Sequence, residues 1–253
     1  MRGADRVLRV LRALNAHNGS GVGRLAELTQ VSRPALYRIV DSLCQQGYVR
    51  KRSSPERYEL TPLVRSLSDG FKDEDWLRHA AGPVMVALQR DVVWPTDIAT
   101  FHGNAMYLRE TTRNQSPMTI DGFTVGMRLP MLRSATGKAY LANCESSERQ
   151  LILENLRRTG HPDDALAHDV RYVKNLVAST LKLGYGERHD DWMVKTGAIA
   201  IPLSHEGRVL ACLNITFIAS VMTTREAADR YLKKMVAAAR KIERAVGAAT
   251  PQT

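Results

Sequence analysis

Two groups of side chains near the start of the chain have the types and spacing needed to contact a polyanion. The first group lies on the polar face of a predicted helix that begins near residue 33, and the second lies in a predicted hairpin over residues 48–60. Arginine and lysine side chains contact phosphates, and arginine, serine and tyrosine also reach the edges of bases in a groove of DNA. The candidate DNA-binding residues are Ser32, Arg33, Pro34, Tyr37, Arg38, Arg50, Lys51, Arg52 and Arg57.

The elements that must position the first group have the pattern of a helix-turn-helix. Apolar residues recur at helical spacing over residues 5–16, a short helix is expected to end near residue 30, and a third begins at Ser32. Ser32 offers an N-cap oxygen, Pro34 fits the first turn, and Gly47 ends the helix in a left-handed conformation. The second helix of such a pair is the one that enters the major groove of DNA.

The second group lies in a predicted wing. Two short strands, residues 48–52 and 57–60, flank a tight turn and carry four basic residues. Such a hairpin can lie along the phosphate backbone. The alternative is a small helical bundle whose hairpin touches no partner, but the order of the elements and the basic hairpin together favour DNA binding.

The charge of the chain is concentrated at this end. The 253 residues include 36 Lys and Arg against 26 Asp and Glu, a net charge of +10. Residues 1–66 hold 12 of the basic and 5 of the acidic residues, so a quarter of the chain holds most of the excess. This division predicts a small basic domain joined to a larger, nearly neutral one, although a basic surface that only maintains solubility would have the same composition.

Other classes of protein are excluded by the same sequence. The longest uncharged run, 16 residues over 209–224, is too short and too polar to span a bilayer, and no apolar signal core follows the first residues, so we expect a cytoplasmic protein. Three widely separated cysteines exclude a CxxC metal or redox site. Residues 136–139 lack the first glycine and the hydroxyl residue of a phosphate loop, and no GxSxG or zinc-ligand spacing occurs. The sequence therefore predicts no enzyme, no cofactor and no metal site.

The rest of the chain predicts a linker and an α+β domain. Helical spacing after Pro62 predicts a linker helix, which places the domains at residues 1–61, 62–75 and 76–253. Antiparallel strands with helices at both ends of the domain argue against a doubly wound fold. The expected elements are helical residues 76–91, a hairpin over 96–110, extended segments at 116–121 and 126–131, helices at 147–158 and 168–183, strands at 198–203 and 209–217, and a long final helix after residue 223.

Several stretches taken together resemble the IclR family of bacterial transcription regulators. The matching stretches are Leu25-Ala26-Glu27-Leu28, residues 32–38 (SRPALYR), residues 43–49 (LCQQGYV), residues 128–139 (RLPMLRSATGKA), Gly184-Tyr185-Gly186 and residues 198–203 (AIAIPL). The resemblance covers essentially the whole chain. It implies an N-terminal winged helix-turn-helix, a linker helix and a C-terminal GAF-like effector-binding domain. It also implies a homodimer or tetramer that binds double-stranded operator DNA and responds to a small organic acid.

A finer resemblance concerns the branch of the family that activates hydroxyphenylpropionate catabolism. Residues 94–97 (WPTD), 109–112 (RETT) and 219–223 (ASVMT) look like that branch. The resemblance implies an activator of an aromatic catabolic operon with a small aromatic carboxylic acid as effector. Two alternatives are a repressor of the same family that answers to a small aliphatic acid, and a GAF-like sensor that acts only through protein contacts.

The resemblance further implies an effector pocket between the loop before residues 137–139 and the two late strands. Arg188 stands where a carboxylate is frequent in the family, and Ala198 where a polar side chain can occur, so an effector of the glyoxylate type is not implied. Arg188, His189 and Trp192 would suit an aromatic carboxylate. The alternative for this segment is a solvated loop of surface charges. The candidate effector-binding residues are Ala135, Thr136, Arg188, His189, Trp192, Ala198, Asn214 and Thr216.

Overall fold

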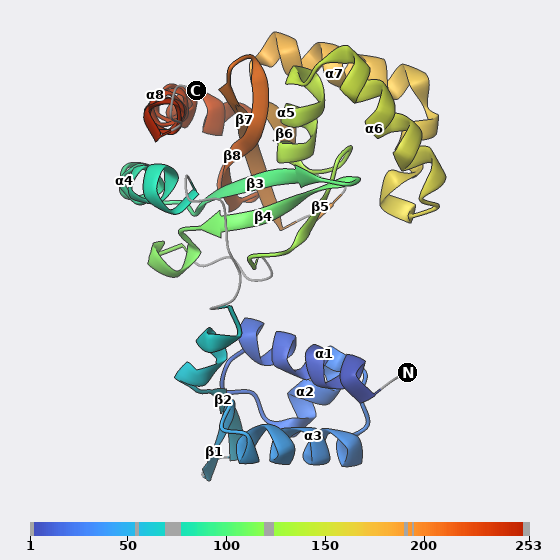
Figure 1. Ribbon diagram of the computed structural model, residues 1–253, viewed down its shortest axis with the longest axis vertical. Helices are drawn as coiled ribbons and strands as arrows, with labels where there is room; N and C mark the ends of the chain where they lie inside the picture. Colours follow the sequence, from blue (N-terminus) through green and yellow to red (C-terminus); the bar gives the residue numbers. More distant parts are fainter. Residues whose placement is uncertain are drawn as a thin grey trace. The chain divides into compact units, whose positions relative to one another are not determined.

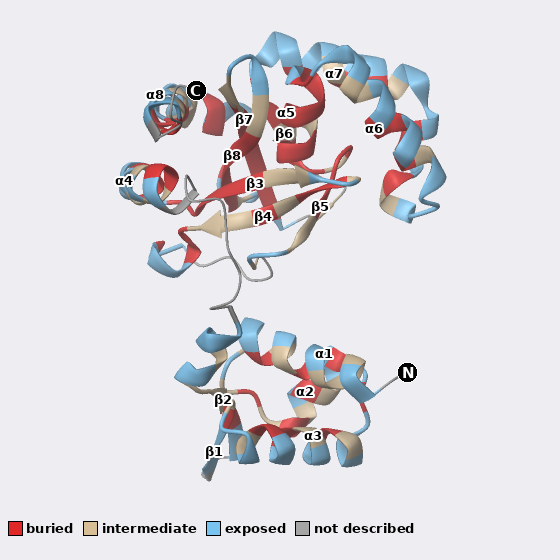
Figure 2. Cartoon of the chain, viewed as in Figure 1, coloured by how far each residue is buried: buried red, intermediate tan, exposed pale blue. Residues whose placement is uncertain are grey.

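The computed structural model describes residues 3–53, 56–68, 77–118, 124–189, 192–193 and 195–249. The chain forms two compact units, residues 1–72 and residues 73–253, which we call the head and the body. Each unit has its own buried apolar core (Figure 2).

The head is a three-helix domain with a two-stranded hairpin. Its elements are α1 (Gly3–Ala16), α2 (Val22–Thr29), α3 (Arg33–Gln45), β1 (Val49–Ser53) and β2 (Glu56–Leu60), and the two strands are antiparallel. The apolar stripes predicted for the helices form its core, in which Leu14, Leu25, Leu36, Val40 and Tyr58 are fully buried. The winged helix-turn-helix that the sequence predicted is therefore confirmed.

The turn between α2 and α3 is held by the backbone. Gln30 adopts the left-handed conformation with a φ of 55°, and its backbone N–H donates to the carbonyl oxygen of Ala26. Ser32 occupies the N-cap position of α3, but its side chain makes no capping hydrogen bond, and its backbone carbonyl accepts from the N–H of Leu36 at 2.9 Å. Gly47, with a φ of 79°, provides the predicted left-handed residue after α3.

The linker predicted over 62–75 is helical in its described part, although the helix is not an α-helix. Residues Pro62–Ser68 form a 3-10 helix, and residues 69–75 lie outside the described residues. The tighter helix follows from Thr61, whose carbonyl accepts from the N–H of Val64 at 3.2 Å and whose hydroxyl accepts from the N–H of Leu63 at 3.2 Å. Bonds between residues three apart, started by a threonine, favour the 3-10 geometry over the α-helix.

The body is built on a six-stranded antiparallel sheet in the order β5-β4-β3-β8-β7-β6. The strands are β3 (Thr96–His102), β4 (Ala105–Thr111), β5 (Arg128–Pro130), β6 (Gly186–Arg188), β7 (Thr196–His205) and β8 (Arg208–Ile218). Glu206 and Gly207 have φ values of 50° and 79°, as expected for a two-residue turn between β7 and β8. The expected extended segment at 126–131 contains β5. No strand forms over residues 116–118, and residues 119–121 lie outside the described residues.

Helices cover both faces of this sheet (Figure 1). The helices α4 (Gly82–Val92) and α8 (Thr224–Ala249) pack on one face, with a π-helical turn, Leu77–Ala81, leading into α4. The other face carries α5 (Ala135–Asn143), with α6 (Ser146–Arg158) and α7 (Val170–Leu183) beyond it. Two 3-10 helices, Arg113–Gln115 and Pro162–His168, complete the described part of the body. The α+β class is confirmed.

Candidate DNA interface and effector site

The polar face of α3 presents its side chains to solvent. Arg33, Tyr37 and Arg38 are exposed, whereas Leu36 and Val40 on the opposite face are buried in the core. Ser32 and Pro34, at the start of the helix, are exposed as well. Within the described parts of the chain, the side chains of Arg33, Tyr37 and Arg38 make no hydrogen bond or ion pair with another residue. The helix thus offers an aromatic ring, two cations and a helix N-terminus to a partner.

The wing has an internal charge partner that the sequence reasoning missed. Glu59 on β2 accepts from Arg50 at 2.8 Å and from Arg52 at 2.9 Å, both on β1. The hydrogen bond from Arg50 is the main reason that the pKa of Glu59 lies below its usual range. The hairpin register pairs Arg50 with Glu59 directly across the strands. Opposite charges attract when they face each other across two strands, so predicting this ion pair requires the exact register of the hairpin.

The other two basic residues of the wing are also engaged. Lys51 pairs with Glu56 at 3.3 Å, and Arg57 donates to the carbonyl oxygen of Gly19 at 3.2 Å. Both side chains remain exposed. The four wing cations are therefore held by contacts within the head, and two acidic residues reduce their net charge.

In the body, strand register brings the predicted effector residues into one row. Arg188 on β6 pairs with Ala198 on β7, which pairs with Thr216 on β8. Directly opposed residues of antiparallel strands share a face of the sheet, and so do residues two apart on one strand. Asn214 therefore lies on the same face as Thr216. We call Arg188, Ala198, Asn214 and Thr216 the sheet row; all four are buried.

The start of α5 covers this face of the sheet. Gly186 lies two residues before Arg188 on β6, and a Cβ there would collide with the carbonyl oxygen of Ala135 and lie 2.6 Å from the backbone nitrogen of Ala139. A glycine at position 186 thus lets the helix backbone rest directly on the strand. Ala135 and Thr136 are buried, and Ser134 caps the helix by accepting from the N–H of Gly137 at 3.0 Å. The structure brings these two residues to the face that bears the sheet row.

Arg188 is buried, with 1% of its surface exposed. Its Nη1 donates to the carbonyl oxygens of Trp192 at 2.9 Å and Thr196 at 2.6 Å, and its Nη2 donates to the hydroxyl of Thr196 at 2.9 Å. The centre of its guanidinium lies 5.6 Å from the centre of the half-buried Trp192 ring. The alternative of a solvated charged loop is wrong for Arg188, because the residue lies inside the protein.

His189 differs from its neighbour. It is exposed, and it lines a cavity of about 510 Å³ together with Lys138 on α5 and Tyr172 and Thr180 on α7. Arg188 and Trp192 therefore form one cluster, whereas His189 faces a hollow between β6 and α7.

A buried aspartate completes the polar face and was not identified as a site residue from the sequence. Asp97 on β3 is 1% exposed and accepts hydrogen bonds from the amide of Asn214 at 3.0 Å and from the hydroxyls of Thr216 at 3.2 Å and Thr111 at 2.6 Å. Burial raises the pKa of its carboxyl above the usual range, although the hydrogen bond from Thr111 and the charge of Arg113 lower it in part. Asp97 pairs with Asn214 across the strands, so a correct strand register would have found it.

A winged helix-turn-helix joined to a body with a polar row beneath a helix defines a class of protein, the DNA-binding regulators with an effector-binding domain. The comparison with known families is specific: residues 3–53 match the IclR helix-turn-helix domain, and residues 73–244 match the C-terminal domain of the bacterial transcriptional regulator IclR. The chain belongs to the IclR family. It is a transcription regulator and not an enzyme.

Curated relatives and solved structures agree with this assignment. The chain is 24% identical over 257 residues to the HTH-type transcriptional regulator KdgR of Escherichia coli (strain K12), with 96% of this chain and 91% of that protein covered. It is 22% identical over 223 residues to the Pca regulon regulatory protein of Pseudomonas putida, with 87% and 75% covered.

Two solved structures show the same fold. The IclR of Thermotoga maritima matches with a TM-score of 0.66 and 18% identity over 96% of this chain and 98% of that one. An IclR homolog from Microbacterium hydrocarbonoxydans, complexed with 4-hydroxybenzoate, matches with a TM-score of 0.60 and 20% identity over 98% and 100%. Among the helices that the structure describes, none has the length and apolarity needed to cross a membrane.

Proposed function

We propose that this regulator binds a small aromatic carboxylic acid in the body and activates an aromatic catabolic operon, binding its operator as a homodimer or tetramer. The observation that carries the proposal is the cluster of Arg188 and Trp192 at the edge of the sheet row. A guanidinium supplies paired donors for a carboxylate, and an indole ring supplies an apolar surface for an aromatic body.

The chemistry of the cluster favours an acid over a neutral ligand. The hydrogen bonds from Arg188 to residues 192–196 end on backbone carbonyls and one hydroxyl. A carboxylate is a stronger acceptor than a carbonyl, so an incoming acid can replace these contacts. That exchange would release Trp192, Met193 and Thr196 from Arg188. A ligand shifts an equilibrium only through such a difference between two arrangements.

The other residues of the sheet row limit where the carboxylate of an effector can bind. Asn214 and Thr216 donate to Asp97, so their donors are already engaged within the protein. The carboxylate of an effector would be repelled by the buried carboxyl of Asp97, so we place it at Arg188 instead. Ala135 and Ala198 are small but tightly packed, so we propose that the ring of the effector enters between the sheet and α5 by displacing the start of the helix from β6. The solved relative with 4-hydroxybenzoate is consistent with such a ligand.

Thermal unfolding of the purified protein with a panel of acids tests this proposal. We expect 3-(3-hydroxyphenyl)propionate or 4-hydroxybenzoate to raise the melting temperature, and a ligand at 100 times its dissociation constant adds about 2.7 kcal/mol of stability. Glyoxylate serves as the aliphatic control. A shift with glyoxylate and none with any aromatic acid would show that the chain belongs with the regulators that answer to small aliphatic acids.

A further inference from the structure

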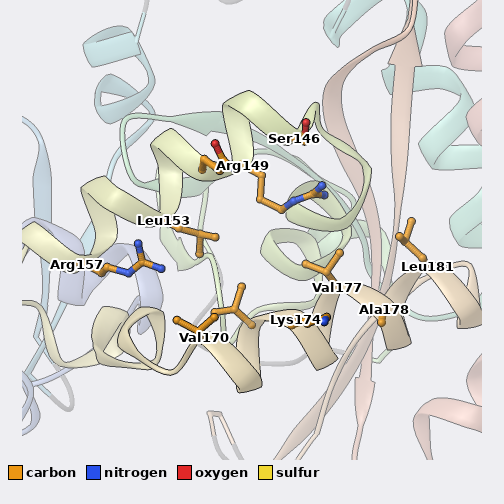
Figure 3. A pocket seen from close by; sticks show the side chains of 11 residues that line it. Ser146, Arg149, Leu153, Arg157, Val170, Lys174, Val177, Ala178 and Leu181 are labelled. Carbon is orange, nitrogen blue, oxygen red and sulfur yellow. The ribbon is translucent and has the colours of Figure 1, made fainter.

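An apolar groove runs between α6 and α7, on the outer side of the body (Figure 3). It has a volume of about 420 Å³, and its apolar lining includes Leu153 of α6 and Val170, Val177 and Leu181 of α7. Val170 and Leu181 are 67% and 54% exposed. Isolated exposed apolar residues are common, but several that line one groove mark a surface for a partner.

Three cationic side chains border this groove: Arg149 and Arg157 of α6 and Lys174 of α7. Arg149 donates to the carbonyl oxygen of Leu141 at 2.8 Å, and Arg157 donates to that of Ala167 at 2.9 Å. These bonds to neutral carbonyl acceptors hold both guanidiniums beside the groove. Lys174 is exposed on α7. Within the described ranges none of the three cations pairs with a carboxylate, and no aspartate or glutamate lines the groove.

The length of the groove fits a helix. Its lining spans residues 146–157 of α6 and 170–181 of α7. At 1.5 Å per residue each stretch is about 18 Å long, or about three helical turns. Peptide helices bind such grooves through apolar residues at positions i, i+3 or i+4, and i+7. The groove is open along its length, whereas small-molecule sites enclose most of their ligand.

The charge of the border determines which helix fits. A second copy that docked through the same groove would bring its own cations against Arg149, Arg157 and Lys174, and like charges oppose such pairing. An acidic helix places carboxylates beside the same cations. We propose that the α6–α7 groove binds an amphipathic helix of another protein, with an apolar stripe on the floor of the groove and acidic residues along its border.

Fluorescence anisotropy with a labelled synthetic peptide tests the proposal on the full-length chain. The probe is a helical peptide of about 14 residues with leucines at positions 1, 4, 8 and 11 and glutamates between them. The matched peptide has lysine in place of each glutamate. We expect the acidic peptide to bind at low salt and the basic one not to bind. Equal binding of the two peptides, or no binding of the acidic one, would overturn the proposal.

Two charge reversals on α7 locate the binding surface. Lys174→Glu changes a cation beside the groove, and Lys182→Glu changes an exposed cation of the same helix that does not line it. We expect Lys174→Glu to weaken peptide binding about tenfold and Lys182→Glu to change it less than twofold. Both variants lose the same net charge, so attraction of the peptide to the basic head cannot mimic the difference. Equal effects of the two reversals would overturn the assignment.

A third variant tests the apolar floor and the competing occupant. Val170→Asn removes an exposed apolar contact without disturbing the core, and we expect about fivefold weaker binding of the acidic peptide. Light scattering of the wild type and this variant reports assembly. A smaller mass for Val170→Asn would mean that a second copy of the chain occupies the groove, and the proposal of a separate acidic partner would then be wrong.

Discussion

Arg188 makes two hydrogen bonds to Thr196: Nη1 donates to its carbonyl oxygen at 2.6 Å and Nη2 donates to its hydroxyl at 2.9 Å. Since β6 ends at Arg188 and β7 begins at Thr196, this contact ties the end of one strand to the start of the next. The residue that we propose as the carboxylate anchor therefore also joins β6 to β7.

Replacing Arg188 with alanine should separate effector response from DNA binding. We expect the body to lose about 3 kcal/mol of stability, because buried carbonyls lose a charged donor. The response of operator affinity to an aromatic acid should disappear, while effector-free operator affinity stays near normal because the head is a separate unit.

Two further variants sharpen this test. Arg188→Lys should also abolish the response of operator affinity to an aromatic acid. A single ammonium cannot make both contacts to Thr196 in the geometry of a guanidinium. Arg208→Ala, at an exposed position of β8, is the matched control and should change stability by less than about 0.5 kcal/mol. If Arg188→Ala still responds at wild-type ligand concentrations, Arg188 does not bind the effector.

The ion pairs of the wing predict opposite effects for two substitutions. We expect Arg52 to contact a phosphate, so Arg52→Ala should weaken binding to all DNA sequences and lower the salt slope by about 0.9. Glu59→Gln removes the carboxylate that Arg50 and Arg52 share, so both guanidiniums become available to phosphates and the slope should steepen. Anisotropy of operator and unrelated duplexes between low and moderate salt measures both changes. An unchanged slope in both variants would exclude the wing from the DNA interface.

The exposed face of α3 should discriminate between sequences. Arg33→Ala or Arg38→Ala should cost about 1–3 kcal/mol on the operator and much less on an unrelated duplex, because base contacts carry the specificity. Arg208→Ala on β8 removes an exposed cation of the body and serves as the control. Equal losses on both duplexes would assign the α3 arginine to the phosphate backbone instead.

We predict a dimer through residues 5–16 and 62–90, and exposed leucines on the head favour it. Leu8 on α1 is 53% exposed, and Leu63 and Leu67 on the 3-10 helix are 44% and 60% exposed. We expect Leu67→Glu to lower the mass measured by light scattering at micromolar protein and to weaken operator binding. Val125→Glu, at a 58% exposed position of the body, should change neither. A monomeric wild type with full operator affinity would contradict the prediction.

Asp97 should make stability depend on pH. Burial raises the pKa of this carboxyl, so the folded protein holds the proton more tightly than the unfolded chain. The free energy of unfolding should therefore fall as the pH rises from about 3.9, the usual value for aspartate, to the raised value.

Asp97→Asn lacks this titration, so the stability difference between wild type and variant isolates it. We expect the wild type to lose stability relative to the variant between pH 4 and neutral pH, as measured by urea unfolding. The charge of Arg113, which lowers the pKa of Asp97 in part, is present in both proteins. A constant difference across this range would show that Asp97 titrates normally.

Periodicity predicted the parts of the fold that are locally specified. The stripe of Leu36 and Val40, the left-handed Gly47 and the turn at Glu206 and Gly207 each follow from a few neighbouring residues. The segment after Pro62 was also predicted to be helical, but apolar spacing does not specify the type of helix, and bonds to Thr61 start a 3-10 helix there.

The sites were less accessible to sequence reasoning because they depend on register between distant strands. Asp97 and Asn214 are 117 residues apart, and only the pairing of β3 with β8 makes them partners. The burial of Arg188 was equally hidden, since a run of charged residues usually indicates a solvated loop. The resemblance to the family located the sheet row, but it did not reveal the aspartate that engages its donors.

The affinity of the full-length protein for its operator, measured with and without a hydroxylated aromatic acid, tests the central claim most directly. We predict that saturating acid changes the operator dissociation constant by about five- to 150-fold, the range expected for coupled sites. The affinity for an unrelated duplex should stay unchanged in the same titration. An operator affinity that is identical with and without every aromatic acid that the protein binds would contradict an effector-controlled regulator.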